Sequence, residues 1–354
     1  MSACRRAGGV VDWHNRPHGS QPTVIRFIAL ALATLGATTD CGLSAAAQVV
    51  CNHGAAAAPV LARLREALAH GRFVAYQPTS LQVTNGRVTP ADAASIRADL
   101  AILRPRFDSL VTYDAVHGAE NIPSIAASLK FRALIIGVWN PLDEAELNAA
   151  SDAARRYPQL VVGVSLGNEL LFSRRSDPQA LGAAIARMRA RLPHTPLSTT
   201  EPFHMYYPES AAALLAELDF LLINVHPIFQ PWFRDAPDST AAQFVLNVAM
   251  KLAQSYCGPI LVRETGVPTA PASAGFSEAR QASFYRQLRR HFPANRDRAF
   301  AYFAAFDAPW RSEDASPVPG PHPEESHWGL YDAARQAKPA ARQLPPLTSP
   351  PTPP

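Results

Sequence analysis

Two glutamates that end short apolar runs are the residues of this chain best suited to acid–base chemistry. Glu169 closes the run at 160–169 and Glu264 closes the run at 258–264. Paired carboxyl groups can divide acid and base work, because burial and a neighbouring charge push their pKa values apart. A single glutamate at a strand end is more often solvated or ion-paired, so the scaffold must bring the two together.

The elements that would position these glutamates alternate regularly along the chain. Eight apolar runs have the length of strands, and they span residues 72–78, 107–114, 132–140, 160–169, 195–201, 219–227, 258–264 and 298–307. Segments with apolar residues three and four apart predict helices between them, at 89–103, 141–157, 177–192, 238–256 and 277–292. The alternation predicts a single-domain α/β fold, the (β/α)8 TIM barrel, which typically takes about 250 residues. An open doubly wound sheet is the alternative, but "AYQPTSLQVTNGR" lacks its glycine-rich loop.

Functional residues of such a barrel lie at the C-terminal ends of its strands. Here every strand end carries polar or aromatic residues: Tyr76, Tyr113, Trp139, Asn168 with Glu169, Glu201, Asn224 with His226, Glu264, and Asp307 followed by Trp310. A barrel radius of roughly 7–8 Å, with side chains that reach about 4 Å inward, leaves the carboxyls of strands four and seven roughly 6 Å apart. Retaining glycosidases need about 5–5.5 Å and inverting ones about 6.5–9.5 Å. The estimate favours retention without deciding it.

Composition and the first residues bear on partners and location. The formal net charge of the 354 residues is +4, without a basic patch, which argues against a nucleic-acid partner. Residues 1–47 predict a signal peptide, because four arginines precede the apolar stretch 27–37 and "LSAAAQ" offers a cleavage site. That stretch is about half the length of a membrane span. We expect a secreted or periplasmic protein without a stable span after cleavage; a buried N-terminal helix is the alternative.

The remaining segments and cysteines complete the domain plan. We expect an N-terminal segment with a helix at 48–71, the catalytic barrel at 72–340 and a proline-rich, disordered tail at 341–354. Cleavage of the signal peptide would leave Cys51 and Cys257, which can form a disulfide in an oxidising compartment or remain two thiols.

Eight short motifs follow one another in a recognisable order. They are "FVAYQP", "LVTYD", "IIGVW", "VVGVSLGNELL", "LLINVHPIF", "ILVRETGVPT", "FAAFDAPWR" and "HWGLYD". This set, over roughly residues 70–335, resembles the bacterial β-1,3-glucanase and glucanosyltransferase branch of glycoside hydrolase family 17. The resemblance implies a (β/α)8 barrel that acts on β-glucan polysaccharide or oligosaccharide with retention, by hydrolysis or transglycosylation, with no cofactor or metal.

The resemblance also implies roles for individual residues. Glu169 would be the general acid/base, with a raised pKa, and Glu264 the ionised nucleophile. Arg263 adjoins Glu264, but strand alternation predicts that its side chain points away. Substrate-binding residues would be Tyr76, Tyr113, Trp139, Asn168 (on the sugar 2-OH), Asn224, His226 and Trp310; Phe229, Trp232 and Trp328 are further candidates for stacking on sugars.

Departures from the family pattern keep other functions open. Val267 stands where the family usually has Trp, Ile228 where Tyr is common, and Ala308 where Glu is common. The alternative function is therefore a non-catalytic glucan-binding barrel protein. A metal-dependent hydrolase that uses His226 and Glu201 is a third, disfavoured reading, because no other strand end carries a histidine.

Overall fold

The computed structural model of the chain describes residues 55–313 and 320–347, all within one compact unit. The predicted signal peptide, Cys51 and the end of the predicted tail lie outside the described residues. Among the described helices, none is long and apolar enough to cross a membrane.

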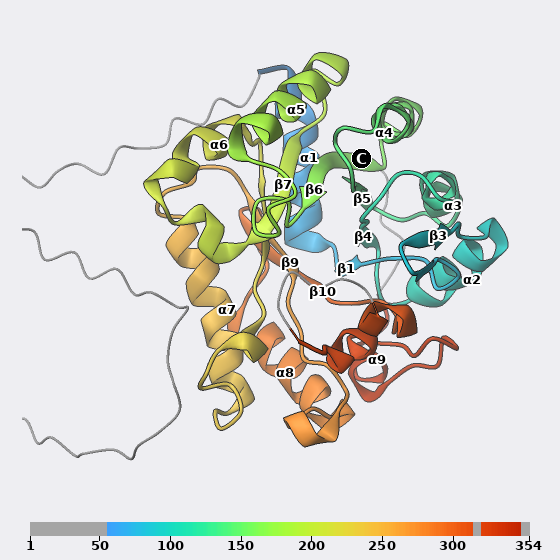
Figure 1. Cartoon of the computed structure of the whole chain (residues 1–354), viewed down its shortest axis with the longest axis vertical. Coiled ribbons are helices and arrows are strands. Elements are labelled where there is room, and N and C mark those ends of the chain that lie inside the picture. The colour runs from blue at the N-terminus through green and yellow to red at the C-terminus, as the bar shows by residue number, and fades with distance from the viewer. Residues whose placement is uncertain (1–54, 314–319, 348–354) are drawn as a thin grey trace, which may run out of the picture. The chain divides into compact units, whose positions relative to one another are not determined.

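Eight parallel strands close into a barrel at the centre of Figure 1. They are β1 (Phe73–Ala75), β4 (Ser109–Val111), β5 (Ala133–Val138), β6 (Val161–Asn168), β7 (Leu197–Pro202), β8 (Leu221–Asn224), β9 (Ile260–Glu264) and β10 (Arg298–Tyr302). Strand β1 pairs with both β4 and β10, so the sheet has no free edge. The predicted (β/α)8 barrel is confirmed, with every predicted strand in its place.

Helices surround this barrel on the outside (Figure 1). They are α1 (Ala58–His70), α2 (Ala93–Leu103), α3 (Ile122–Ser128), α4 (Glu144–Arg156), α5 (Pro178–Arg191), α6 (Ala212–Glu217), α7 (Asp238–Leu252), α8 (Glu278–His291) and α9 (Pro339–Arg342). A hairpin of β2 (Gln82–Thr84) and β3 (Arg87–Thr89) follows β1. The helix predicted from residue 89 therefore starts at Ala93, where the Asp92 carboxylate accepts a hydrogen bond from the Ser95 backbone N–H at 2.8 Å.

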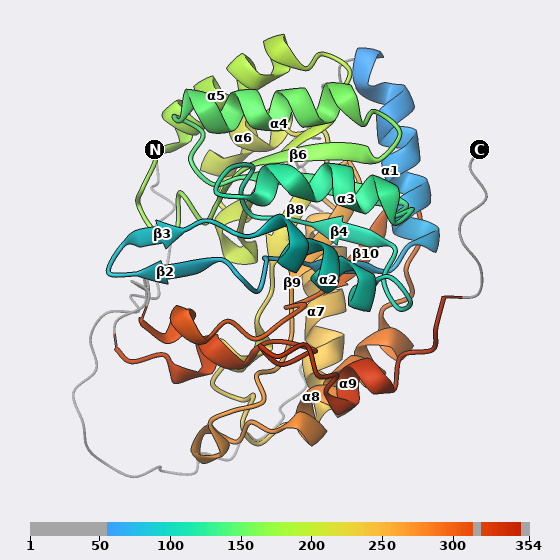
Figure 2. The same cartoon turned by 90° about the vertical axis from the view of Figure 1, so that its right-hand side faces the viewer.

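The barrel interior is filled by alternate residues of its strands. Phe73, Val111, Ile135 and Leu222 belong to one buried cluster, which also contains Leu64 of α1. Figure 2 shows α1 at one end of the barrel and the β2–β3 hairpin at the other. The hairpin end is the C-terminal end of the strands, since the hairpin follows β1. With the N-terminal end covered by α1, chemistry is confined to the opposite end.

The first seven residues of the predicted disordered tail are part of the folded structure. Residues 341–347 are in the structure, where Ala341 and Leu344 are buried and the Leu347 N–H donates to the Pro105 carbonyl at 2.9 Å. The apolar side chains at these two positions explain why this part of a proline-rich segment packs on the barrel.

Candidate active site

Strand β6 reaches the C-terminal end of the barrel through a bulge. Ser165 pairs with Ser198 and Asn168 pairs with Thr200. Between these two pairs β6 advances by three residues and β7 by only two. Gly167 lies within this bulge with φ 86°, and Glu169 follows with φ 54°. A bulge re-aims the side chains after it, and here these are Asn168 and Glu169.

Glu169 lies in a partly buried position beside strands β7 and β8. Its backbone N–H donates to the Thr200 carbonyl at 2.7 Å, and its Oε1 accepts a hydrogen bond from Asn224 Nδ2 at 2.8 Å. Burial raises the pKa of the Glu169 carboxyl, and the negative charge of Glu264 raises it further, against the lowering effect of the Asn224 hydrogen bond. This environment favours a protonated carboxyl.

Strand β9 carries a second bulge, directly before its glutamate. Val262 pairs with Ile223 and Glu264 pairs with Asn224, which leaves Arg263 without a partner on β8. The prediction that the Arg263 side chain points away from Glu264 is therefore wrong, because the bulge interrupts the alternation on which it relied.

Arg263 instead extends into the barrel and is almost fully buried, with 1% exposed. Its guanidinium donates hydrogen bonds to Asn168 Oδ1 and, at 2.9 Å, to the Thr112 carbonyl. It also stacks 4.2 Å from the ring centre of Tyr113. One buried cation thus joins the ends of β4, β6 and β9.

Glu264 is buried between two partners that can carry positive charge. Arg263 Nη1 lies 3.7 Å from its Oε1, and His226 Nε2 lies 3.5 Å from its Oε2. Burial by itself would raise the pKa of Glu264, but the interaction with His226 and the charges of Arg263 and Arg311 outweigh it and hold the pKa below its usual value. This environment favours an ionised carboxylate.

Aromatic rings and free polar atoms complete the surroundings of Glu264. The rings of Trp328 and Phe303 lie 5.0 Å and 5.3 Å from that of His226. Within the described residues, the buried atoms here that lack a hydrogen-bond partner include Tyr113 Oη, Asn224 Oδ1, His226 Nδ1 and Glu264 Oε1. Because buried polar atoms are normally paired, these four suit a ligand rich in hydroxyl groups.

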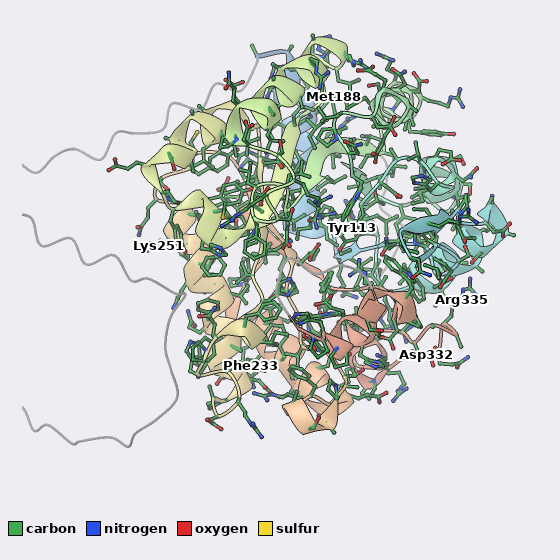
Figure 3. All side chains as sticks on the ribbon, in the orientation of Figure 1. Tyr113, Met188, Phe233, Lys251, Asp332 and Arg335 are labelled. Atoms are coloured by element: carbon green, nitrogen blue, oxygen red, sulfur yellow. The ribbon has the colours of Figure 1, made fainter. Side chains whose placement is uncertain are left out.

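The predicted substrate-binding residues fall into two groups. Asn168, Asn224, His226 and Tyr113 lie with the two glutamates, and Tyr113 is near the centre of Figure 3. Trp310 shares a pocket with Tyr113, in which Arg311 Nη2 donates to Gln77 Oε1 at 2.9 Å. Trp139 is 43% exposed, with the Arg175 guanidinium 4.5 Å from its ring centre.

Tyr76 is a predicted substrate-binding residue that the structure places away from the glutamates. Its side chain is fully buried outside the barrel, where the hydroxyl donates to Asp99 Oδ2 of α2 at 2.9 Å. Its ring belongs to the apolar layer between strands and helices. Alternation along β1 explains the placement, because Ala75, its neighbour, lies in the cluster with Tyr113 and Trp328.

Val267, which departs from the family pattern, has a packing role. Val267 is fully buried in the layer between strands and helices, and its carbonyl accepts a hydrogen bond from Gln281 Nε2 at 3.1 Å. Its side chain is therefore part of the core. Among the other stacking candidates, Phe229 is 53% exposed and Trp328 only 2%, while Trp232 packs 5.4 Å from the Phe244 ring.

Glu201 at the end of β7 is a buried carboxyl for which the sequence indicates only the disfavoured role of a metal ligand. It is fully buried, and its two oxygens accept hydrogen bonds from the backbone N–H groups of Leu171 and Phe172 at 2.9 Å and 3.1 Å. Burial raises its pKa to about 7. Over the part of the chain that the structure describes, no three His, Cys, Asp or Glu residues form a group able to hold a metal.

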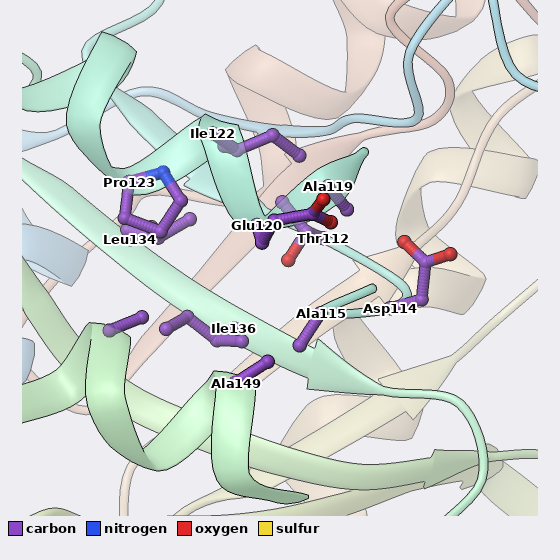
Figure 4. Close-up of a pocket in the computed structure, with 11 residues that line it drawn as sticks. Thr112, Asp114, Ala115, Ala119, Glu120, Ile122, Pro123, Leu134, Ile136 and Ala149 are labelled. Atoms are coloured by element: carbon purple, nitrogen blue, oxygen red, sulfur yellow. The ribbon is translucent and has the colours of Figure 1, made fainter. Parts of the chain in front are cut away.

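Two further features lie away from the glutamates. Cys257 is disulfide-bonded, while its predicted partner Cys51 lies outside the described residues, so their pairing stays a prediction. Figure 4 shows a small pocket lined mainly by aliphatic residues of β5, α3 and α4, with Asp114 and Glu120 beside it. Its strand residues Leu134 and Ile136 face the outer layer, so it is separate from the candidate active site.

Comparisons with known proteins bear on the fold and the family of the chain. A curated glucan 1,3-beta-glucosidase from Arthroderma benhamiae is 26% identical over 262 residues, which cover 70% of this chain and 84% of the relative. The crystal structure of a glycoside hydrolase family 17 β-1,3-glucanosyltransferase from Rhizomucor miehei has a TM-score of 0.58 and 22% identity, covering 76% of this chain and 96% of that one. An active-site mutant of the same kind of enzyme, in complex with laminaritriose, has a TM-score of 0.59 and 21% identity over the same shares of the two chains.

The two solved structures are only 21% and 22% identical to this chain, so their similarity shows a shared fold and no more. The decisive match is to a family model, the BtgE/BtgC glycoside hydrolase domain, which covers residues 74–329 and thus well over half of the chain. This stretch contains the barrel from Val74 in β1 to the end of β10, and both glutamates. The chain belongs to the BtgE/BtgC glycoside hydrolase domain family.

Proposed function

We propose that the protein cleaves β-1,3-glucan with retention of configuration, with Glu264 as nucleophile and Glu169 as general acid/base. The observation that carries the proposal is the opposite electrostatic environment of two carboxyls at the same end of the barrel. The pKa of Glu169 is raised, chiefly by burial, and that of Glu264 is lowered by His226 and the nearby arginines despite burial. The names of the relatives support β-1,3-glucan as the substrate.

The proposed reaction has two steps. In the first, a Glu264 oxygen attacks the anomeric carbon while the bond to the leaving oxygen breaks, and Glu169 gives that oxygen its proton. In the second, Glu169 takes a proton from water or from a sugar hydroxyl, whose oxygen attacks the anomeric carbon and releases Glu264. Water gives hydrolysis and a second glucan gives transglycosylation. Asn168, which Arg263 orients, would bind the 2-OH of the sugar.

Substitution of the two glutamates tests the assignment. We expect Glu264→Gln to abolish release of products from laminari-oligosaccharides, because no nucleophile remains. Glu169→Ala should lose the oligosaccharide reaction but keep cleavage of a dinitrophenyl glycoside, whose leaving group needs no proton, and azide should accelerate it to a β-glycosyl azide. Chromatography of the released products measures both reactions.

Two results would contradict the proposal. Wild-type protein that binds laminari-oligosaccharides without releasing or rearranging them would be the non-catalytic glucan-binding protein. Azide rescue of Glu264→Ala to a β-glycosyl azide would reverse the two roles.

We also propose that the protein is exported. The disulfide at Cys257 supports this, because such bonds persist in oxidising compartments. Mass spectrometry of the mature N-terminus should find Gln48 first; a mature protein that retains residues 1–47 would contradict export by a cleaved signal peptide.

A further inference from the structure

The turn that carries Glu169 is held by β7 from both sides. At the start of the turn, the Glu169 N–H donates to the Thr200 carbonyl at 2.7 Å. Within the turn, the N–H groups of Leu171 and Phe172 donate to the Glu201 carboxyl at 2.9 Å and 3.1 Å. Adjacent residues of one strand therefore fix the chain on both sides of Glu169.

The backbone of Glu169 needs such support. Its φ of 54° lies in the left-handed region, which residues with a Cβ adopt at a cost in energy. Strained residues of this kind persist where the surrounding structure determines them, often at functional sites. The Ser173 N–H donates to the Glu169 carbonyl at 2.9 Å and closes the turn, while Glu201 holds the two N–H groups in its middle.

Glu201 itself is placed to act through this turn rather than on a substrate. Its side chain is fully buried and both of its oxygens already accept backbone hydrogen bonds. A buried carboxyl is costly, and a polar side chain at this position is explained only by the groups that it binds. Those groups belong to the segment that immediately follows Glu169.

We propose that Glu201 is a positioning residue for Glu169: it holds the turn after β6 so that the Glu169 carboxyl faces the leaving oxygen. The inference rests on the proposed function, because it assumes that Glu169 is the acid/base. A displacement of the acid of about 1 Å can lower the rate by roughly 100-fold. The loss of kcat/KM, which reports the first step, should appear only where the leaving group needs a proton.

The test compares two substrates in two variants. Glu201→Ala removes both acceptors, and Glu201→Gln keeps the shape but sets an amide N–H2 against one backbone N–H. We expect kcat/KM on laminari-oligosaccharides to fall about 100-fold in Glu201→Ala and about 10-fold in Glu201→Gln. On a dinitrophenyl β-glucoside, which needs no acid, kcat/KM should stay within about threefold. Should Glu201→Ala not fold, the nearly isosteric Gln variant still decides.

Asp108 offers a matched control in the same barrel. It is a buried carboxyl just before β4 that accepts a backbone hydrogen bond from Arg72 at 2.8 Å and lies 2.9 Å from Arg132 Nε. Asp108→Asn should therefore weaken comparable bonds at the N-terminal end of the barrel while leaving the turn at Glu169 intact. We expect it to change kcat/KM for the two substrates by the same factor.

The outcomes separate the inference from the function on which it rests. An equal fall on both substrates in the Glu201 variants would overturn the positioning role, and so would an Asp108→Asn variant with the same selective loss. Wild-type protein that cleaves neither substrate would instead overturn the proposed function.

Discussion

The ends of β6 and β9 share a backbone bulge but give their glutamates different electrostatic surroundings. Each strand presents a glutamate, and each bulges within its last few residues, after Ser165 in β6 and at Arg263 in β9. At β6 the bulge leaves Glu169 beside the neutral amide of Asn224. At β9 the bulge turns a buried arginine onto Glu264.

This difference shifts the pKa values of the two carboxyls in opposite directions. Both are shielded from solvent, and burial favours the protonated form of each. At β9, His226 and two arginines reverse that preference, whereas at β6 the charge of Glu264 strengthens it. Identical side chains on one rim thus have pKa values shifted in opposite directions, as the proposed retaining mechanism requires.

The largest effect should come from removing the cation at β9. Arg263→Met takes away a charge that lowers the pKa of Glu264 and the group that orients Asn168. We expect kcat/KM to fall by about 100-fold or more, and its acid limb to move to higher pH because the Glu264 pKa rises. Loss of the buried partner should also lower the free energy of unfolding by about 3–5 kcal/mol. Urea denaturation and a pH profile measure the two effects.

Arg189 provides the control for that experiment. Its Nη1 lies 2.8 Å from the fully buried carboxylate of Asp219, away from both glutamates. Arg189→Met should destabilise the protein as well but leave the acid limb of kcat/KM in place. An Arg263→Met variant with an unmoved acid limb would show that this arginine does not control Glu264.

A smaller effect should come from the neutral partner at β6. Asn224 Nδ2 donates to Glu169, which stabilises the ionised carboxylate and lowers its pKa. In Asn224→Ala the pKa of Glu169 should therefore rise, and the basic limb of kcat/KM should move to higher pH. We expect a loss of about 10-fold at the optimum from poorer orientation of the acid. A basic limb that moves to lower pH would mean that the amide does not act as a donor to Glu169.

The sequence predicted the barrel well because hydrophobic alternation of strands and helices survives local irregularity. Both glutamates also follow from the strand ends. What the alternation could not reveal was which side chains turn inward after a bulge, since a one-residue insertion reverses the facing of the residues beyond it. Arg263 was assigned outward for this reason, and Gly167 within "SLGNE" was the one local sign of a bulge.

Other differences have equally local causes. Tyr76 was counted with the strand-end residues, but β1 ends at Ala75 and the tyrosine turns to Asp99 of α2. Glu201 has no sequence signal of its role, because its partners are backbone N–H groups contributed by a different strand end. Interactions between two side chains can be recognised from residue types. Interactions between a side chain and the backbone are harder to recognise, because any residue can supply the backbone group.

The most direct test is an NMR titration of protein labelled with 13C at the glutamate carboxyl carbons. Spectra of Glu169→Gln and Glu264→Gln assign the two signals. We predict that the Glu169 signal titrates above the ordinary glutamate pKa of 4.5 and the Glu264 signal below it. If Glu264 titrated above that value and Glu169 below it, the assignment of acid and nucleophile to β6 and β9 would be contradicted.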